Sequence, residues 1–201
     1  MANLLELQNF CENKSIIIVG NSSRILRHSK GRLIDGYDIV VRINRGYQPD
    51  NSFAESLGIK TNILSVGVKS ATQASHIILS NKVNYILSPI IWSDKLSYSN
   101  VYDIETSLYH KLKEDLGDIK PSTGISTFNF FHKLINYKRL DLIGFDFFET
   151  STIHTNQLGH RKVNDHNGKK EESYIKNNLD STRTTVYQLG GPIEVNNIPR
   201  I

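Results

Sequence analysis

Residues Ser15–Asn44 read SIIIVGNSSRILRHSKGRLIDGYDIVVRIN, and this stretch decides the fold. It opens with a β-branched apolar run, Ile16–Val19, which is typical of a buried strand. A small polar turn begins at Gly20, and a second strand-like run, Asp38–Asn44, follows a segment long enough for a short helix. This is the layout of a nucleotide-binding α/β unit, in which backbone N–H groups after the first strand can bind a phosphate. The turn is neither GxGxxG nor a Walker A loop, so neither a dinucleotide nor ATP is the first expectation.

The rest of the chain alternates predicted strands with predicted helices. Further strands are expected at 61–66, 84–88 and 140–144, and helices at 70–80, 104–116, 122–135 and 171–189. Segment 48–60 is expected to be a loop with a short helical stretch, and segments 90–103 and 147–170 are expected to be irregular. The alternation predicts a single Rossmann-like α/β domain over residues 1–201, with a mainly parallel sheet and helices on both faces.

The composition narrows the class of protein. The chain has 201 residues, of which 38% are hydrophobic and 22% charged, as in an ordinary globular domain. No apolar run approaches the ~20 residues of a membrane span, and the N-terminus does not read as a signal peptide. One cysteine, Cys11, cannot form an internal disulfide, which suits a reducing cytoplasm. The net charge of +4 fits an anionic sugar nucleotide or an anionic membrane, and nucleic acid ranks last because the basic residues are scattered.

Two asparagines follow the first two predicted strands. Asn21 lies in the turn between Gly20 and Ser22, and Asn44 ends the second strand, where ligands of open α/β sheets bind. Each amide can both donate and accept, which suits phosphate oxygens and a ribose hydroxyl together. The structural alternative is that Asn21 supports a tight turn and Asn44 acts as a cap.

The sequence KPSTG, residues 120–124, opens a predicted helix. Ser122 or Thr123 can cap this helix, whose first turn offers unpaired N–H groups and a positive dipole end. Gly124 lets a ligand approach the backbone, so an anion or a nucleotide edge fits here. The alternative is a plain N-cap.

A histidine-rich segment precedes the last predicted helix. His166 can titrate near neutrality and act as a general base, and Glu171 is expected in the first helical turn. Glu171 would either orient the imidazole or stabilise the helix start. His154 and His160 lie nearby in sequence, but HTNQLGHRKVNDH lacks the spacing of a known zinc motif, so no metal site is predicted.

In this order, the three motifs resemble those of the sialyltransferase family with eukaryotic-type motifs. VGNS…G…ID…D.V.R.N corresponds to the family's large motif, PSTG…D…GF to its small motif, and His166 with Glu171 to its very short motif. His154 takes the place of the third-motif histidine. The residues that match the large and small motifs are Val19, Gly20, Asn21, Ser22, Gly31, Ile34, Asp35, Asp38, Val40, Arg42, Asn44, Pro121, Ser122, Thr123, Gly124, Asp141, Gly144 and Phe145.

The resemblance implies a CMP-sugar glycosyltransferase with a single Rossmann-like domain that works without a metal or other cofactor. His166 would take the proton from the acceptor hydroxyl, Glu171 would orient it, and His154 is a further catalytic candidate. The implied donor site consists of Gly20, Asn21, Ser22, Asn44, Ser122, Thr123, Gly124 and Gly144.

Departures from the family pattern refine this expectation. The family's cysteine pair is missing, since Tyr137 occupies one position and Ser15 or Ile16 the other, and no N-terminal membrane anchor is expected. Both features point to a bacterial cytoplasmic enzyme, with peripheral contact to the inner membrane. The family's GFG ends in Asp146 here, which would be the nucleophile of a retaining, double-displacement mechanism or, alternatively, a cap for the following turn.

The leading prediction is transfer of a nonulosonic (sialic-acid-like) sugar from CMP to a cell-surface glycan or its lipid-linked precursor. Two alternatives stay open: transfer of Kdo from CMP-Kdo, and a non-catalytic CMP-binding domain of a larger transferase. Retention of His166 with Glu171 speaks against the non-catalytic alternative, and the short chain speaks for it. The expected partners are a CMP-activated acidic sugar and a glycan acceptor, with no nucleic acid.

Overall fold

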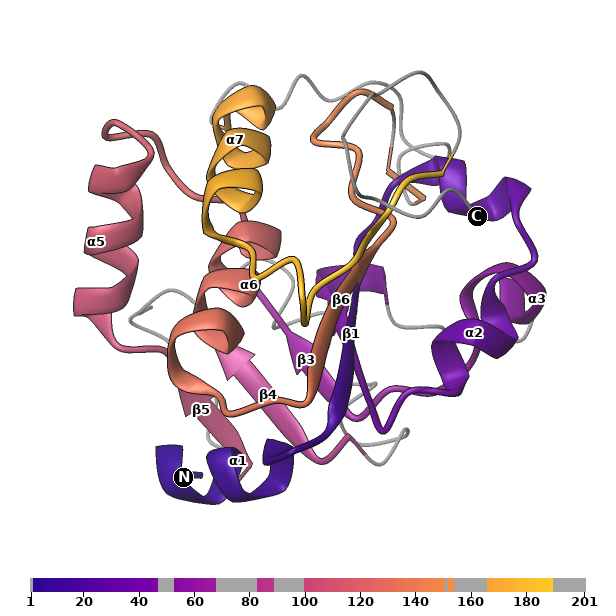
Figure 1. Cartoon of the computed structure of the whole chain (residues 1–201), viewed down its shortest axis with the longest axis horizontal. Coiled ribbons are helices and arrows are strands. Elements are labelled where there is room, and N and C mark those ends of the chain that lie inside the picture. Colours follow the sequence, from indigo (N-terminus) through magenta and orange to yellow (C-terminus); the bar gives the residue numbers. More distant parts are fainter. Residues whose placement is uncertain are drawn as a thin grey trace.

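A seven-stranded sheet forms the centre of the computed structural model, which describes residues 2–46, 53–67, 83–88, 100–150, 152–153 and 166–189 (Figure 1). The strands are β1 Ser15–Val19, β2 Ile39–Ile43, β3 Ile63–Ser65, β4 Tyr85–Ser88, β5 Val101–Asp103, β6 Arg139–Ile143 and β7 Val186–Tyr187. Their order is β5-β4-β3-β2-β1-β6-β7, and every neighbouring pair is parallel. The parallel sheet expected from the sequence is therefore confirmed.

Helices cover both faces of the sheet, as predicted. In Figure 1, α5, α6 and α7 lie on one side of the sheet, and α2 and α3 lie on the other. The helices are α1 Leu4–Cys11, α2 Gly31–Asp35, α3 Ala54–Leu57, α5 Thr106–Asp115, α6 Thr123–Leu134 and α7 Gly168–Asn178, with short 3-10 helices η1 Ser23–Arg27 and η2 Asn44–Gly46. None of the helices in the described part of the chain combines the length and hydropathy that crossing a bilayer requires.

Side-chain alternation along the strands divides the core into two layers. In β1, Ile16 and Ile18 face the layer that contains the phenylalanines of α6, whereas Ile17 and Val19 face the layer beneath α2 and α3. A strand that is buried on both faces has a continuous apolar sequence, which is why the run Ile16–Val19 predicts a strand in the centre of the sheet. All four of these side chains are at most 1% exposed.

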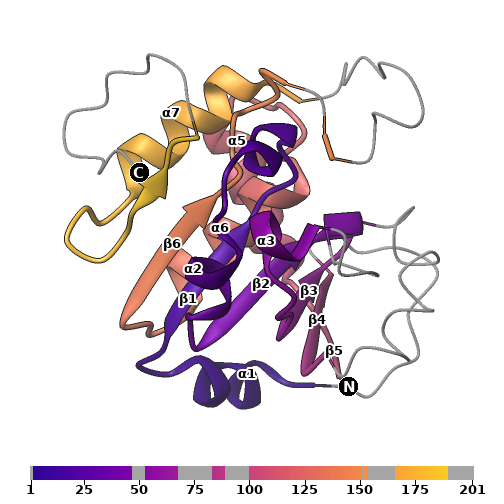
Figure 2. The same ribbon diagram turned by 90° about the vertical axis from the view of Figure 1, so that its right-hand side faces the viewer.

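The strand order reverses next to β1, because the chain runs from β1 outward to β5 and then returns to place β6 on the other side of β1. Ligands of open parallel sheets bind at the carboxyl ends of the strands beside such a reversal. In Figures 1 and 2, α1 lies beyond the opposite edge of the sheet, at the amino ends of the strands. Gly20, Asn44 and Gly144, which follow β1, β2 and β6, are thereby brought to one edge.

Two predicted segments need correction, and one helix was not predicted. The last helix was expected at 171–189, but α7 ends at Asn178 and β7 pairs with β6 instead. Asp180 accepts hydrogen bonds from the backbone N–H and hydroxyl of Thr182, and this turn competes with a further helical turn. The irregular segment 90–103 ends in the edge strand β5, and α1 was not predicted. The helix expected at 70–80 lies outside the described residues.

Two charged residues of the matched motifs, Arg42 and Asp35, make contacts that stabilise the fold. The guanidinium of Arg42 is fully buried and donates to the carbonyl oxygens of Leu57, at 2.7 Å, and Lys60, at 3.0 Å. Burial lowers the pKa of Arg42 to about 10, while the nearby carboxylate of Asp35 opposes that shift. Asp35 in turn accepts the backbone N–H groups of Ile59 and Lys60. These contacts hold the chain between α3 and β3, so Asp35 and Arg42 act on the fold.

Candidate active site

A cavity of about 270 Å³ opens at the carboxyl edge of the sheet, between the ends of β1, β2 and β6 and the starts of α6 and α7. Eleven predicted site residues line it: Gly20, Asn21, Ser22, Asn44, Ser122, Thr123, Gly124, Gly144, Asp146, His166 and Glu171. His154, the remaining predicted residue, lies outside the described residues. The structure therefore brings residues from five separate segments of the chain into one cavity.

Two glycines allow the chain segments after β1 and β6 to touch at the floor of the cavity. A Cβ on Gly20 would lie 2.4 Å from the carbonyl oxygen of Gly144, a distance that no side chain tolerates. Gly144 has a φ of 74°, in the left-handed region that favours glycine. The backbone N–H of Ser22 donates to the same carbonyl oxygen at 3.0 Å. These contacts fix the turn that the sequence pattern assigned to phosphate binding.

The two asparagines play different structural parts. The Nδ2 of Asn21 donates to the carbonyl oxygen of Ile43 at 3.0 Å, whereas its buried Oδ1 has no partner among the described residues. Asn44 is bonded on both sides: its Nδ2 donates to the hydroxyl of Thr123 at 3.3 Å, and its Oδ1 accepts the N–H of Gly67 at 2.7 Å. A buried amide oxygen without a donor is costly, which favours a ligand that supplies one.

The start of α6 forms one wall of the cavity. Ser122 is the N-cap, and its hydroxyl accepts the backbone N–H of Ile125 at 3.3 Å, which confirms the predicted cap. Gly124 packs against Phe145, whose ring carbon would lie 2.9 Å from a Cβ at that position. The first turn of α6 therefore presents its N–H groups and positive dipole end to the cavity at close range.

Glu171 is tied to this helix start. It is 3% exposed, and its two carboxylate oxygens accept the backbone N–H and the hydroxyl of Ser122 at 2.9 and 2.7 Å. Burial raises the pKa of Glu171, while the bonds from Ser122 and the charge of nearby His166 oppose the rise. Glu171 was expected either to orient the imidazole or to stabilise the helix start, and its side-chain hydrogen bonds go to Ser122. The longer reach of a glutamate from α7 makes this link between two helix starts possible.

His166 lies just before α7 and is held through its ring. Its Nδ1 is 2.9 Å from the carbonyl oxygen of Lys120. A carbonyl oxygen can only accept, so Nδ1 carries the proton and Nε2 of the neutral ring is the acceptor. The ring stacks on that of Phe148, with ring centroids 5.6 Å apart and planes 14° apart. This tautomer is the one that a general base in the cavity requires.

Asp146 is committed to the turn after β6. Its Oδ2 accepts the hydroxyl of Ser22 at 2.8 Å, the backbone N–H of Thr150 at 3.0 Å, and the hydroxyl of Thr150. These bonds match the alternative in which Asp146 caps the turn, and they tie that turn to the end of β1. Nothing in this bonding pattern sets Asp146 apart as a nucleophile.

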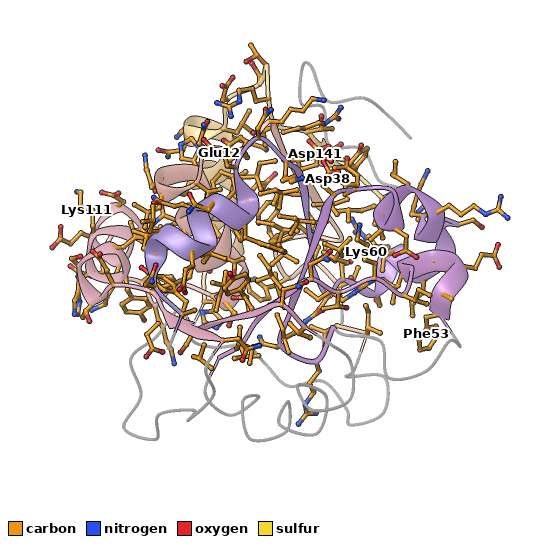
Figure 3. The ribbon with its side chains drawn as sticks, turned by 90° about the horizontal axis from the view of Figure 1, so that it is seen from below. Glu12, Asp38, Phe53, Lys60, Lys111 and Asp141 are labelled. Carbon is orange, nitrogen blue, oxygen red and sulfur yellow. The ribbon has the colours of Figure 1, made fainter. Side chains whose placement is uncertain are left out.

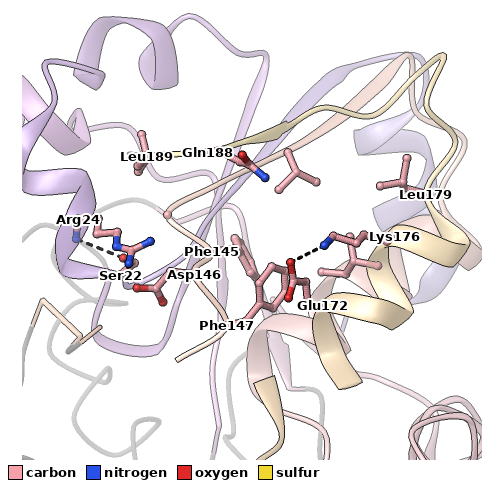
Figure 4. Close-up of a pocket in the computed structure, with 13 residues that line it drawn as sticks. Ser22, Arg24, Phe145, Asp146, Phe147, Glu172, Lys176, Leu179, Gln188 and Leu189 are labelled. Carbon is pink, nitrogen blue, oxygen red and sulfur yellow. Dashed lines mark hydrogen bonds and ion pairs between the residues drawn. The ribbon is translucent and has the colours of Figure 1, made fainter. Parts of the chain in front are cut away.

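A smaller cavity of about 40 Å³ lies behind the same turn (Figure 4). Ser22, Asp146, Phe145 and Phe147 line both cavities, so the turn after β6 is the wall between them. On the far side, Glu172 and Lys176 of α7 form an ion pair at 2.6 Å. Most of the remaining lining is apolar: Ile175, Leu179, Val186 and Leu189.

Sequence reasoning missed the aromatic and hydroxyl side chains of the turn after β6. Phe147, Phe148 and Thr150 line the main cavity, yet their segment was expected only to be an irregular loop. An apolar pair, Phe147-Phe148, directly after a strand end in a polar segment was the available signal. That pair could not be assigned to the site from the sequence, because the turn that brings Phe148 to His166 has no local sequence pattern.

The described residues hold no group of three histidine, cysteine, aspartate or glutamate side chains that could bind a metal ion. Cys11 is buried in α1, and burial raises the pKa of its thiol to about 12. A thiol of such high pKa is a weak ligand and a weak nucleophile at neutral pH. The described residues that line the cavity offer amides, hydroxyls, one imidazole and two carboxylates.

Known proteins share this fold. Two crystal structures match at 18% identity: a mammalian sialyltransferase, with a TM-score of 0.60, and a mammalian sialyltransferase in complex with Gal-beta-1-3GalNAc-ortho-nitrophenol, with a TM-score of 0.59. Each match covers 92% of this chain and 72% of the other, which establishes a common fold. No curated protein sequence matches the chain. The sequence model of glycosyltransferase family 29 (sialyltransferase) matches residues 9–137, more than half of the chain, and the chain therefore belongs to this family.

Proposed function

We propose that this glycosyltransferase moves a sialic-acid-like sugar from its CMP-activated donor to a hydroxyl of a cell-surface glycan or of its precursor, with His166 as the general base. The observation that carries the proposal is the tautomer of His166. Its Nδ1 donates to Lys120 at 2.9 Å, so a basic Nε2 is left in a cavity that also contains a helix start suited to an anion.

The donor site is the part of the cavity between the strand ends and α6. The N–H groups of the first turn of α6 and its dipole suit the phosphate of CMP. The unpaired Oδ1 of Asn21 suits a hydroxyl donor such as the ribose. Gly20, Ser22 and Gly144 keep the floor close enough for backbone contacts, and Asn44 holds Thr123 in place.

The reaction needs two kinds of help at once. The bond from the sugar's anomeric carbon to the phosphate oxygen breaks through an oxocarbenium-like state, and the start of α6 stabilises the negative charge that develops on CMP. The acceptor oxygen forms the new bond to that carbon and gives its proton to Nε2 of His166. The carboxylate of Glu171 lies close enough to His166 for an electrostatic interaction with the imidazolium that results.

The proposal includes no metal and no other cofactor, since backbone N–H groups can hold the phosphate. We also propose that the protein is located in the cytoplasm of a bacterium, in peripheral contact with the inner membrane. The support for this location is the single cysteine and the net charge of +4.

The test is CMP release from CMP-Neu5Ac and from CMP-Kdo, each with a panel of glycan acceptors. Release that depends on both an acceptor and CMP-Neu5Ac supports the proposal. If CMP is released only from CMP-Kdo, the transferred sugar is Kdo and not a sialic-acid-like sugar. If CMP binds but no condition gives release, the chain is a non-catalytic binding domain. If CMP at millimolar concentration does not raise the stability of the folded protein, the donor-site assignment is wrong.

His166→Ala tests the general base directly. Transfer is expected to fall ~100- to 10,000-fold, the usual contribution of a general base, while CMP affinity stays near the wild-type value. Asp146→Ala is the companion variant, expected to loosen the turn without removing turnover. A dead Asp146 variant with a sugar adduct on Asp146 in the wild type, beside an active His166 variant, would replace the inverting mechanism by a retaining one.

A further inference from the structure

Phe148 is an exposed aromatic residue in direct contact with the proposed base. Its side chain lines the cavity and is 41% exposed. Its ring lies nearly parallel to the imidazole of His166, with an interplanar angle of 14° and a centroid separation of 5.6 Å. This geometry is an offset stack.

The hydrogen bond from His166 to Lys120 cannot by itself aim the imidazole. A single bond at Nδ1 fixes one atom of the ring, so the ring can still tilt about that point. A second contact, made by the whole ring face, removes the tilt. Phe148 supplies that contact, so it fixes the plane in which the lone pair of Nε2 points.

The backbone that carries Phe148 is in a conformation that bulky residues rarely adopt. Phe147 and Phe148 have φ values of 52° and 70°, both in the left-handed region. The bonds of Asp146 to Thr150 and Ser22 hold this turn in place. Backbone strain that is held by its surroundings is common at functional sites.

The same turn is locked to the start of α7. A Cβ on Gly168 would lie 1.8 Å from the carbonyl oxygen of Phe147, so only glycine allows the two segments to approach this closely. Gly168 is the first residue of α7 and lies two residues after His166. The strained turn and the segment of the histidine are therefore positioned against each other.

We propose that Phe148 is a positioning residue that holds the imidazole of His166 in the plane required for proton abstraction. This inference rests on the proposed function, and it adds a residue outside the sequence motifs to the working site. Phe148 is not among the residues proposed to bind CMP, and its effect is assigned to its ring contact with His166.

The experiment compares Phe148→Leu, Phe148→Tyr and the wild type in kcat, in KM for donor and acceptor, and in CMP affinity. Phe148→Leu keeps an apolar side chain but loses the flat face, and kcat is expected to fall ~10- to 100-fold, as for other small misplacements of a reacting group. CMP affinity and the KM for the donor should not change. Phe148→Tyr keeps the ring and should restore most of kcat.

Phe53→Leu is the matched control, because Phe53 is 42% exposed and lies next to α3, away from the cavity. Its kcat should equal that of the wild type. A second readout needs no turnover: NMR signals of the His166 ring protons should move downfield in Phe148→Leu, where the ring current of the phenyl group is lost, and remain in place in Phe53→Leu.

The outcomes separate this inference from the proposed function. A wild-type protein that releases no CMP with any donor contradicts the proposed function and, with it, the role of Phe148. A wild type that turns over, with unchanged kcat in Phe148→Leu, contradicts the positioning role alone. Equal losses in kcat and in CMP affinity mean that the substitution disturbs the whole cavity, which also overturns the positioning role.

Discussion

Asp141 and Glu171 are the two carboxylates that are buried most completely among the described residues, at 0% and 3% exposure, yet their surroundings differ. Asp141, in the middle of β6, accepts the backbone N–H of Thr185 at 2.7 Å, the guanidinium of Arg139 at 2.5 Å and the hydroxyl of Tyr37 (Figure 3). Glu171, at the start of α7, accepts two hydrogen bonds from Ser122 alone.

The difference separates a residue that serves the fold from one that serves the site. The charge of Asp141 is paired with a cation, and its bonds from Thr185 and Tyr37 join β6 to the segments before β7 and β2. Among the described residues Glu171 has no directly bonded cation, and its burial raises its pKa. A buried carboxylate with a raised pKa in a cavity is a common mark of a functional site, whereas a fully paired one is more often structural.

Asp141→Ala gives the largest expected effect on stability. It leaves the Tyr37 hydroxyl and the Thr185 N–H without their acceptor, and it removes the partner of Arg139. The free energy of unfolding should fall by ~2 to 5 kcal/mol, because each buried polar group that is left without its acceptor costs ~1 to 3 kcal/mol. Urea denaturation measures this loss, and turnover per folded molecule should stay unchanged.

Asp38→Ala is the control for that experiment. Asp38 is exposed and accepts hydrogen bonds only from the N–H and hydroxyl of Ser15 among the described residues. Its loss should cost no more than ~1 kcal/mol. Equal losses of unfolding free energy in the two variants would mean that the hydrogen bonds of Asp141 stabilise the fold no more than those of Asp38.

Glu171→Gln should change how stability depends on pH. The pKa of Glu171 is raised above its ordinary value of 4.5, so between pH 4.5 and the raised pKa the folded protein binds more protons than the unfolded chain. Rising pH therefore lowers the contribution of Glu171 to stability across that window, and the loss is complete above the folded pKa. The glutamine variant lacks this titration.

The measurement is urea denaturation of both proteins from pH 4 to pH 8. The wild type should lose stability relative to Glu171→Gln as pH rises through the lower part of this range, and the difference should then level off. A difference that grows in favour of the wild type would mean that Glu171 has a lowered pKa, and that its bonds to Ser122 outweigh its burial.

Much of the site could be predicted because its residues come at the ends of regular elements. The carboxyl ends of parallel strands meet at one edge, so Asn21, Asn44 and Gly144 had to lie near one another once the strands were recognised. Ser122 was predictable as an N-cap, and His166 as a residue just before a helix. Periodicity and capping, which are local signals, were enough for these positions.

The contacts between side chains were not predictable in the same way. Glu171 was expected either to orient His166 or to stabilise the helix start, and no local signal indicated that its partner is Ser122, far away in sequence and brought near by the packing of α6 beside α7. Phe148 stacks on His166 because two successive residues adopt left-handed backbone, which the sequence FF does not suggest. β7 was missed because its two residues are too few to show a period.

Chelation gives the smallest expected effect, namely none. The two carboxylates of the cavity are already hydrogen-bonded within the protein: both oxygens of Glu171 accept from Ser122, and the Oδ2 of Asp146 accepts from Ser22 and Thr150. The proposed reaction places its negative charge at the start of α6, which needs no ion. CMP release should therefore be the same with EDTA as without it, and the same after later addition of Mg²⁺, Mn²⁺ or Zn²⁺.

His154 and His160 lie outside the described residues, so this assay also tests whether they supply a metal site. Turnover that EDTA abolishes and one of these ions restores would replace the metal-free mechanism, and it would make the bonds of Glu171 to Ser122 a state of the metal-free protein alone.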